Sequence, residues 1–264
     1  MPEGDTVLVT AGRLQRALAG SRLTRTDLRV PAFATTDLSG QTVGEVVARG
    51  KHLLLRTEAG VTVHSHLKME GTWELRRVGR PLPRPAHEIR AVLATVDWMA
   101  VGMRLGTLEV LPTSAETDLL GHLGPDVLGP DWDAREAVRR LLLEPDRAVH
   151  EAVQDQRVMA GPGNVYANEV GFLRGLHPAT PVGSVRDPQA LVDLMKRVME
   201  ANRTLGRQVT TGDTRRGRDR WVYGRRGEPC RRCGTPIRRT AADEIRVRYW
   251  CPSCQPGPDG GPGG

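Results

Sequence analysis

The sequence contains few of the residues from which aromatic cores, membrane spans and disulfide frameworks are built. Phenylalanine occurs only at Phe33 and Phe172, so the hydrophobic core must consist mainly of Leu, Val and Ala. No apolar run approaches the ~18 residues needed to cross a bilayer, and the N-terminus lacks the basic, apolar and small-residue segments of a secretion signal. We therefore expect a cytoplasmic protein with no membrane partner, whose four cysteines bind metal rather than form disulfides.

Basic residues outnumber acidic ones, and nearly all of them are arginine. The formal net charge is +7, and lysine occurs only at Lys51, Lys68 and Lys196. An excess of positive charge indicates a polyanionic partner. The length of 264 residues is sufficient for two modest domains, or for one domain with an appendage.

The N-terminal half combines one helix with a series of short strands. The pattern predicts a helix that is capped by Asp5 or Thr6, runs to about Ala19 and stops at Gly20. Short segments with strand character then follow, separated by turns and by an Arg- and Pro-rich loop over 76–85. We expect a β-sandwich or flattened barrel with the first helix packed on it. The predicted strands are 42–49, 52–56, 61–67, 72–75 and 89–96.

The C-terminal half changes to helical periodicity. Asp133 and Glu136 form a capping-box pattern, and Pro145 ends that helix. Further helices are predicted over about 147–155, from Gly163-Asn164 to Gly175, and from an Asp187-Pro188 cap to about residue 205. The fold class is therefore α+β. We divide the chain into a β-sandwich domain (1–115), a hinge (116–132), a helical domain (133–224), a zinc finger (225–255) and a disordered Gly/Pro tail (256–264).

Four cysteines are arranged as two Cys-x-x-Cys pairs. Cys230 and Cys233 are separated from Cys251 and Cys254 by 17 residues, a spacing typical of a four-cysteine zinc site. Such a site has no open position, so a single zinc ion would be structural and would order a segment too short to form its own core. The alternative is a redox pair or free thiols.

Arginines surround the cysteine pairs. A rigid hairpin that carries many guanidinium groups suits contact with phosphates, and a solvated basic face is the alternative. The residues are Arg225, Arg226, Arg231, Arg232, Arg238, Arg239, Arg246 and Arg248.

The first residues after the initiator methionine are chemically suited to catalysis. Removal of Met1 would leave Pro2 with a free secondary amine, and Glu3 would supply an acid/base beside it. An α-amine has a pKa of about 8, so part of it is an unprotonated nucleophile at neutral pH. The alternative is an idle, exposed terminus.

Several other residues are candidates for contact with a polyanion. Gly163-Asn164 opens a helix, where backbone N–H groups can approach a phosphate and Asn164 can add a donor. Lys51 lies at the start of a strand, beside a glycine. Met69 follows a predicted strand and lies in a loop, from which an apolar side chain could enter a base stack, although a core Met is more common. We interpret His64 and His66, on one strand face, as structural.

These pieces occur in the same order as in a known family. Pro2-Glu3-Gly4, Arg49-Gly50-Lys51-His52, Gly163-Asn164-Val165-Tyr166 and Tyr223-Gly224-Arg225 before the cysteines resemble motifs of the formamidopyrimidine-DNA glycosylase/endonuclease VIII family. The resemblance covers essentially the whole chain except the tail.

The resemblance implies a bifunctional base-excision repair enzyme that acts as a monomer on damaged double-stranded DNA in a bacterial cell. Pro2 would form a Schiff base at C1′ as the base leaves, and Glu3 would act at the sugar ring oxygen. Lys51 matches the lysine of β-elimination, and Arg246 the zinc-finger arginine that serves δ-elimination. The matching DNA-binding residues are Lys68, Met69, His122 and Asn164.

The lesion class depends on two departures from the formamidopyrimidine branch. The region 101–106 lacks the Phe of that branch's intercalating loop, and the segment 210–220 is short for a loop that caps 8-oxoguanine. Both favour the endonuclease VIII branch and oxidised pyrimidines, although Lys68-Met69-Glu70 is not that branch's usual Gln-Leu-Tyr. The alternatives are a glycosylase for 8-oxoguanine and formamidopyrimidine, and a non-catalytic, zinc-dependent DNA-binding protein.

Overall fold

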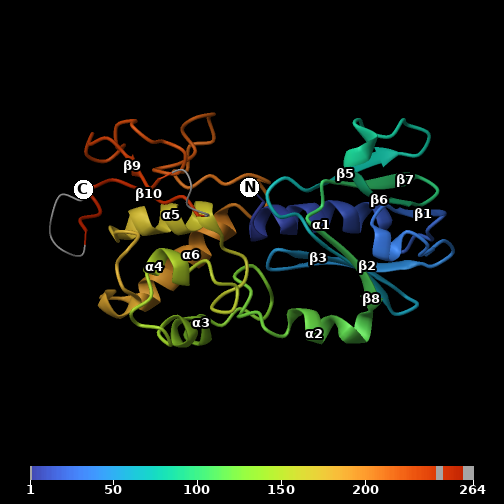
Figure 1. Cartoon of the computed structure of the whole chain (residues 1–264), viewed down its shortest axis with the longest axis horizontal. Helices are drawn as coiled ribbons and strands as arrows, with labels where there is room; N and C mark the ends of the chain where they lie inside the picture. The colour runs from blue at the N-terminus through green and yellow to red at the C-terminus, as the bar shows by residue number, and fades with distance from the viewer. Residues whose placement is uncertain (1, 242–245, 258–264) are drawn as a thin grey trace. The chain divides into compact units, whose positions relative to one another are not determined.

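A computed structural model describes residues 2–241 and 246–257. Met1, and the part of the predicted disordered tail from residue 258 onward, lie outside the described residues. The chain forms two compact units, Met1–His122 and Leu123–Gly264 (Figure 1). No helix within the described ranges is long and apolar enough to span a membrane.

The N-terminal unit contains two four-stranded antiparallel sheets. Their strand orders are β1-β6-β7-β5 and β2-β3-β4-β8, which confirms the sandwich prediction. Strands β1, β7 and β8 were not predicted, and β5 continues through two residues of the expected 76–85 loop. The strands are β1 (Arg25–Leu28), β2 (Val43–Arg49), β3 (His52–Thr57), β4 (Val61–His66), β5 (Thr72–Arg77), β6 (Ile89–Ala94), β7 (Trp98–Met103) and β8 (Thr107–Pro112).

Helix α1 (Gly4–Leu18) packs on both sheets of the sandwich. The prediction that Asp5 or Thr6 caps it is wrong by one turn: Glu3 is the N-cap residue, and its side chain makes no capping hydrogen bond. Leu14 and Leu18 are buried as predicted. The consequence for the site is that Glu3 stands at the first turn of α1, where the helix dipole favours a negative charge.

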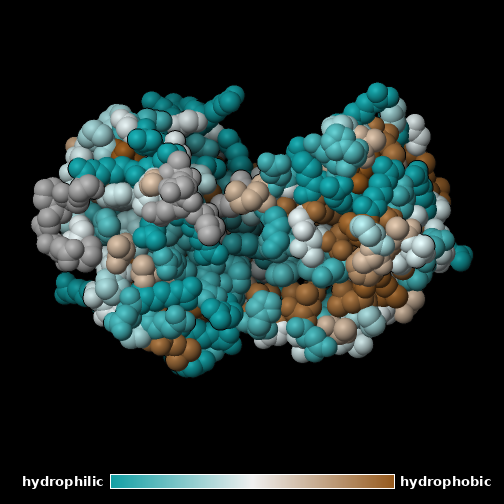
Figure 2. Space-filling view, in the orientation of Figure 1, coloured by the Kyte–Doolittle hydropathy of each residue, from teal (hydrophilic) through white to brown (hydrophobic). Residues whose placement is uncertain are grey.

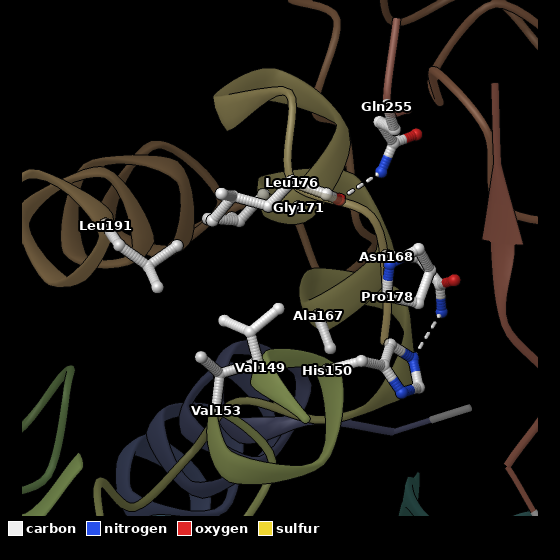
Figure 3. A pocket seen from close by; sticks show the side chains of 11 residues that line it. Val149, His150, Val153, Ala167, Asn168, Gly171, Leu176, Pro178, Leu191 and Gln255 are labelled. Atoms are coloured by element: carbon white, nitrogen blue, oxygen red, sulfur yellow. Dashed lines mark hydrogen bonds between the residues drawn. The ribbon is translucent and has the colours of Figure 1, made fainter. Parts of the chain in front are cut away.

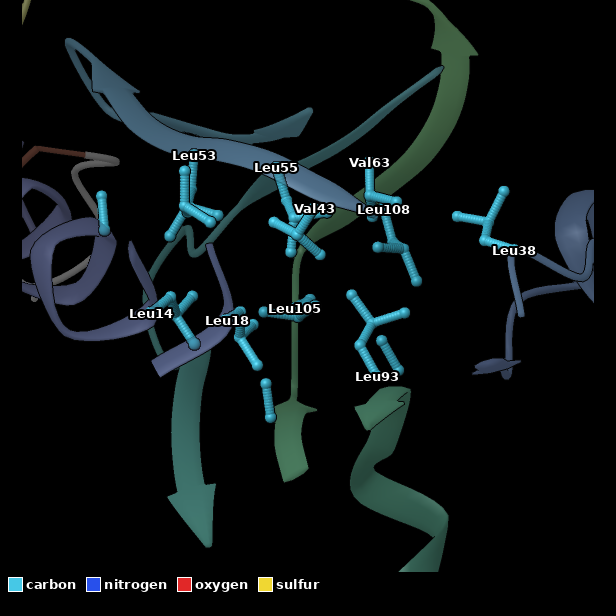
Figure 4. Close-up of a cluster of buried hydrophobic side chains, with 14 of the residues drawn as sticks. Leu14, Leu18, Leu38, Val43, Leu53, Leu55, Val63, Leu93, Leu105 and Leu108 are labelled. Atoms are coloured by element: carbon cyan, nitrogen blue, oxygen red, sulfur yellow. The ribbon is translucent and has the colours of Figure 1, made fainter. Parts of the chain in front are cut away.

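The core lies between the sheets and under α1 (Figure 4). Leu53 and Leu55 alternate along β3 towards this core, and Val63 and Leu108 contribute from β4 and β8. Alternation leaves the other face of this sheet for polar side chains. This other face carries His52 and Arg56 of β3 and His64 of β4. Glu116 of α2 (Glu116–Leu120) accepts hydrogen bonds from Arg56. Helix α2 was not predicted.

The C-terminal unit consists of four α-helices and a short hairpin. The helices are α3 (Ala134–Leu141), α4 (Val149–Ala152), α5 (Asn164–Arg174) and α6 (Pro188–Ala201), and the hairpin strands are β9 (Arg238–Arg239) and β10 (Tyr249–Trp250). Asp133 and Asp187 cap α3 and α6 as predicted. The second half of the predicted capping box is wrong, because the Glu136 carboxylate pairs with arginines one turn later.

Helices α4 and α5 are joined by two turns. Helix α4 is shorter than predicted, whereas α5 ends as expected at Gly175, which adopts a left-handed conformation (φ 69°). Gln156 stabilises the connection, since its side chain donates to Pro162 O and accepts from Gly161 N. Asp155 accepts from Arg157 and Arg147 and its pKa is lowered, first by the bond from Arg157.

Candidate functional site

The N-terminal residues are enclosed by the fold rather than exposed. Pro2 is half-buried, and Glu3, whose backbone is extended, is completely buried. A terminus without a function is normally solvated. The burial of a carboxylate beside the chain's first residues therefore favours the catalytic interpretation of Pro2 and Glu3.

Three connections meet at one edge of the β2-β3-β4-β8 sheet. Arg49 pairs with His52, His52 with His66, and His66 with Thr107. The β2–β3 turn, the β4–β5 turn and the start of β8 are therefore neighbours. Lys51 lies in the two-residue turn before β3 rather than within the strand, and Gly50 supplies the positive φ (56°) at the first turn position.

The β4–β5 turn presents Lys68 and Met69 at this edge. Lys68 has φ 53°, an uncommon value for a residue with a side chain. Its backbone N–H donates to Nδ1 of His66 at 2.9 Å, which stabilises the turn. Gly106 leaves room for the Lys68 side chain, because a Cβ there would lie 2.0 Å from Lys68 Cγ. Met69 is 65% exposed, so it is available for contact with a partner.

The β7–β8 connection offers no apolar side chain of this kind. Leu105 is buried in the sandwich core (Figure 4), and Gly102 is needed because a Cβ would approach Leu105 Cδ1 to 2.6 Å. Arg104 is the exposed side chain of this segment, with φ 47° and an ion pair to Glu88. Met69 is therefore the one exposed apolar side chain among the residues of these two connections.

Three histidines lie behind the same edge. His52 Nδ1 is 2.9 Å from His64 Nε2, and His64 Nδ1 is 2.9 Å from a Glu109 carboxylate oxygen. His64 and His66 make hydrogen bonds within the protein, as expected of structural residues. His52 was not identified from the sequence. Burial and the neighbouring His66 lower the pKa of His52 to about 3.

His66 and His122 complete this group. Burial, Lys68 and Lys51 lower the pKa of His66 to about 4, so both lysines act on one imidazole. His122 is exposed, follows α2 and also lowers the pKa of His52. The structure thus brings Lys51, Lys68 and His122 close to the imidazoles of His52 and His66.

Asn164 begins α5 but does not project alone towards solvent. Its side-chain amide donates to Val247 O at 3.0 Å. Val247 follows Arg246, which is exposed. The structure therefore places the two predicted phosphate contacts of the C-terminal unit beside each other. Most side chains on the face of this unit seen in Figure 2 are hydrophilic.

The arginines of the cysteine module have divided roles. Arg225 is buried and bonds Glu228 and two backbone carbonyls, and Arg231 bonds the carbonyls of residues 217 and 220. Arg232 stacks on Phe172, and Arg248 pairs with Glu151. These four arginines therefore make contacts within the protein.

The four cysteine sulfurs form one cluster. The Sγ atoms of Cys230, Cys233, Cys251 and Cys254 all lie within 4.8 Å of one another. A tetrahedral zinc ion with bonds of about 2.3 Å requires sulfurs about 3.8 Å apart, and three of the six Sγ pairs are separated by 3.4 to 4.0 Å. The donor set and its dimensions fit a metal ion.

Glu169 is a buried residue that the sequence did not reveal. Its carboxylate accepts from the backbone N–H groups of Trp221, Val222 and Tyr223 at 2.7, 2.9 and 2.8 Å, and from the Thr210 hydroxyl. These bonds secure the Tyr223-Gly224-Arg225 segment before the first cysteine pair. No signal in the sequence distinguishes this glutamate from a solvated one on the same helix.

Family models match most of the chain. Residues 1–106 match the formamidopyrimidine-DNA glycosylase N-terminal domain, and residues 123–213 match the formamidopyrimidine-DNA glycosylase H2TH domain. Both halves of the molecule therefore match models of one protein family.

Full-length relatives agree with these matches. The chain is 53% identical over 255 residues to the DNA-(apurinic or apyrimidinic site) lyase Nei2 of Mycolicibacterium smegmatis, covering 97% of this chain and 99% of the relative. It is 50% identical to the endonuclease 8 2 of Mycobacterium tuberculosis, covering 97% and 100%. The fold matches Lactococcus lactis Fpg in complex with DNA containing an abasic site, with a TM-score of 0.82, 23% identity, and coverage of 97% and 100%.

Proposed function

Because the chain belongs to the formamidopyrimidine-DNA glycosylase/endonuclease VIII family, we propose that it is a bifunctional DNA glycosylase and apurinic/apyrimidinic lyase of base excision repair. The observation that carries the proposal is the enclosed Pro2-Glu3 pair at the N-terminus of α1. A fully buried carboxylate next to an N-terminal secondary amine combines a nucleophile with an acid/base.

The reaction begins at the amine of Pro2, after removal of Met1, which lies outside the described residues. The amine lone pair attacks C1′ of the damaged nucleotide, the bond from C1′ to the base breaks, and the sugar ring opens to an iminium. Glu3 exchanges a proton with the ring oxygen during opening. Loss of the C2′ proton then expels the 3′ phosphate in β-elimination, and δ-elimination releases the 5′ phosphate. Lys51 serves the first elimination and Arg246 the second.

Damaged double-stranded DNA is the proposed partner, bound by the chain as a monomer. Extrusion of a base costs on the order of a few kcal/mol, and an inserted apolar side chain offsets part of that cost. Met69 is suited to this role because it is 65% exposed on a turn that His66 and Gly106 define. Lys68, His122 and Asn164 contact the DNA near the extruded nucleotide.

One zinc ion is the proposed cofactor. It is bound by Cys230, Cys233, Cys251 and Cys254, whose sulfurs have the separations of a tetrahedral site. With four thiolates there is no open coordination position, so the ion orders the hairpin and takes no part in bond making.

Oxidised pyrimidines are the proposed lesions, for two structural reasons. Leu105 is committed to the core, so the β7–β8 connection has no apolar wedge of its own. The segment 210–220 is closed on itself, since Thr210 N donates to Asp219 O at 2.8 Å and Thr211 bonds Arg218 O. A short, closed segment leaves little chain to fold over a purine. Thymine glycol, 5-hydroxycytosine and dihydrouracil fit this description.

Borohydride trapping tests the proposal. Protein verified to lack Met1 is incubated with duplexes containing thymine glycol, 8-oxoguanine or an abasic site, and reduction converts any iminium into a stable adduct. We expect adducts with the abasic site and with thymine glycol. Absence of adducts with all three duplexes would leave a non-catalytic DNA-binding protein, whereas preference for 8-oxoguanine would reverse the lesion assignment.

A matched pair of proteins tests the role of the terminus. Pro2→Gly and protein that retains Met1 should lose trapping, while their affinity for the duplex stays within a few fold of the parent. An equal collapse of affinity would mean that Pro2 has a structural role.

A further inference from the structure

One stripe of α5 faces the strand that carries Arg246 into the cysteine hairpin. Asn164, Asn168 and Phe172 are spaced by four residues, so they share one helix face. Phe172 packs with Cys230 and Cys251. The two asparagines lie further towards the N-terminus of the helix and contact the strand around β10 instead.

The side chains of the two asparagines form hydrogen bonds with the backbone of this strand, as the backbone of a neighbouring β-strand would. Asn164 donates to Val247 O at 3.0 Å, and the Asn168 side-chain oxygen accepts from Tyr249 N at 2.5 Å. Asn168 also donates to the backbone oxygen of Asn164 at 2.6 Å, which ties the two side chains to the first turn of α5. Val247 and Tyr249 are two residues apart, so the bonded groups lie on one edge of the strand.

Behind Asn168 lies a buried imidazole. His150 Nε2 is 3.2 Å from the Asn168 amide nitrogen, and both residues line a small pocket between α4 and α5 (Figure 3). Burial, more than the nearby Arg248, lowers the pKa of His150 to about 3, so the ring is neutral. A neutral, enclosed partner restricts the Asn168 side chain to one orientation.

The pairing of β9 with β10 is too short to define the position of this strand by itself. Strands β9 and β10 have two residues each and share two paired positions, Tyr249 with Arg239 and Trp250 with Arg238. A two-stranded hairpin of this size is marginal in water. In this strand the cysteines, Cys251 and Cys254, lie beyond Trp250, so metal binding constrains the far end of the strand more directly than the end at Arg246.

We propose that Asn168 is a positioning residue: together with Asn164 it holds the Val247–Tyr249 backbone against α5 and so places Arg246 for δ-elimination, independently of the metal. The role of Arg246 rests on the proposed function, whereas the attachment of the strand does not. The two parts can therefore be tested separately.

Asn168→Leu removes the hydrogen bonds of this side chain to Tyr249 N, Asn164 O and His150 while keeping a side chain of similar size. Gln255→Leu is the matched control, because Gln255 also connects the module to α5, by accepting from Cys251 N and donating to Leu176 O, but at the other end of the module (Figure 3). Both variants are prepared as full-length protein with zinc bound, and zinc content is measured in each.

Amide hydrogen exchange tests the attachment without reference to activity. In Asn168→Leu the Tyr249 amide should exchange at least about tenfold faster than in the parent, since it loses its acceptor, with one zinc per chain retained. In Gln255→Leu the Tyr249 amide should be unchanged. Unchanged exchange in Asn168→Leu, or loss of its zinc, would overturn the proposal.

Product analysis on abasic-site DNA tests the consequence for Arg246. Asn168→Leu should give a δ to β product ratio about tenfold lower than the parent, with the yield of the borohydride adduct within twofold. An unchanged ratio, or the same fall in Gln255→Leu, would refute the positioning role. Absence of any adduct with the parent protein would instead count against the proposed function, and the exchange result would still decide the attachment.

Discussion

Replacing the buried carboxylate of Glu169 by an amide should loosen the segment that leads into the cysteine module. One carboxylate oxygen accepts from Val222 N and Tyr223 N, and the other from Trp221 N and the Thr210 hydroxyl. In Glu169→Gln an NH2 group takes the place of one oxygen and faces the donors that had bonded to it, so up to two of these four bonds are lost.

The size of the effect follows from the number of bonds lost. A hydrogen bond to a charged group contributes about 1.5–3 kcal/mol, so the loss of two should lower the free energy of unfolding by about 3–5 kcal/mol. For a protein of this size that corresponds to a fall in melting temperature of about 10 °C. The same substitution at Glu200, whose carboxylate is partly exposed and pairs with Lys196 and Arg203, should cost less than about 1 kcal/mol.

Urea denaturation followed by tryptophan fluorescence measures the free energies, and hydrogen exchange of the amides at 221–223 locates the change. The exchange of these three amides should accelerate in Glu169→Gln and stay unchanged in Glu200→Gln. A destabilisation no greater than that of Glu200→Gln, or full protection of the three amides, would refute the assignment of Glu169 as the residue that orders this segment.

Three further predictions concern the histidines, the sheet edge and the metal. Burial lowers the folded-state pKa of His52 and His150 to about 3, below the unfolded value, so the stability they contribute is present above about pH 6.5 and is lost as the pH falls. When the pH falls from 7.5 to 5, each histidine should lower the free energy of unfolding, measured by urea denaturation, by about 2 kcal/mol. His52→Gln should reduce this dependence of stability on pH. Gly106→Ala should weaken duplex binding several-fold by displacing the Lys68 side chain, whereas Gly12→Ala on α1 should not. Chelation of zinc should unfold the hairpin and reduce duplex affinity; retained affinity and an unchanged circular dichroism spectrum would contradict the zinc assignment.

The predictions that held concern short stretches of chain. Gly175 as the end of α5, Asp187 as the cap of α6 and Asp133 as the cap of α3 depend on residues within a few positions of each other. Local conformational preferences and side-chain capping act over this range, so they can be read from the sequence. The start of α1 was misplaced because Glu3 fills the N-cap position with no capping bond to mark it.

The residues of the candidate site were predicted less completely than the ends of the helices. Pro2, Glu3, Lys51 and Asn164 were candidates from their local chemistry, and the roles that the resemblance implies for them stay predictions. The sequence held no indication that Leu105 would be buried while Met69 is exposed, although both follow strands. It also did not indicate that Asn164 bonds Val247, because that contact joins residues 83 positions apart.

By itself the sequence determined the α+β class, the grouping of four cysteines into one module with the spacing of a metal site, and the basic character of the molecule. Each of these follows from periodicity, spacing or composition. Only the tertiary structure decided which connections share the sheet edge with Lys51, which arginines are committed to internal bonds, and that Asn168 and Glu169 attach α5 to the cysteine module. These contacts depend on strand register and helix packing between distant segments, and a buried polar residue has the same letter in the sequence as an exposed one.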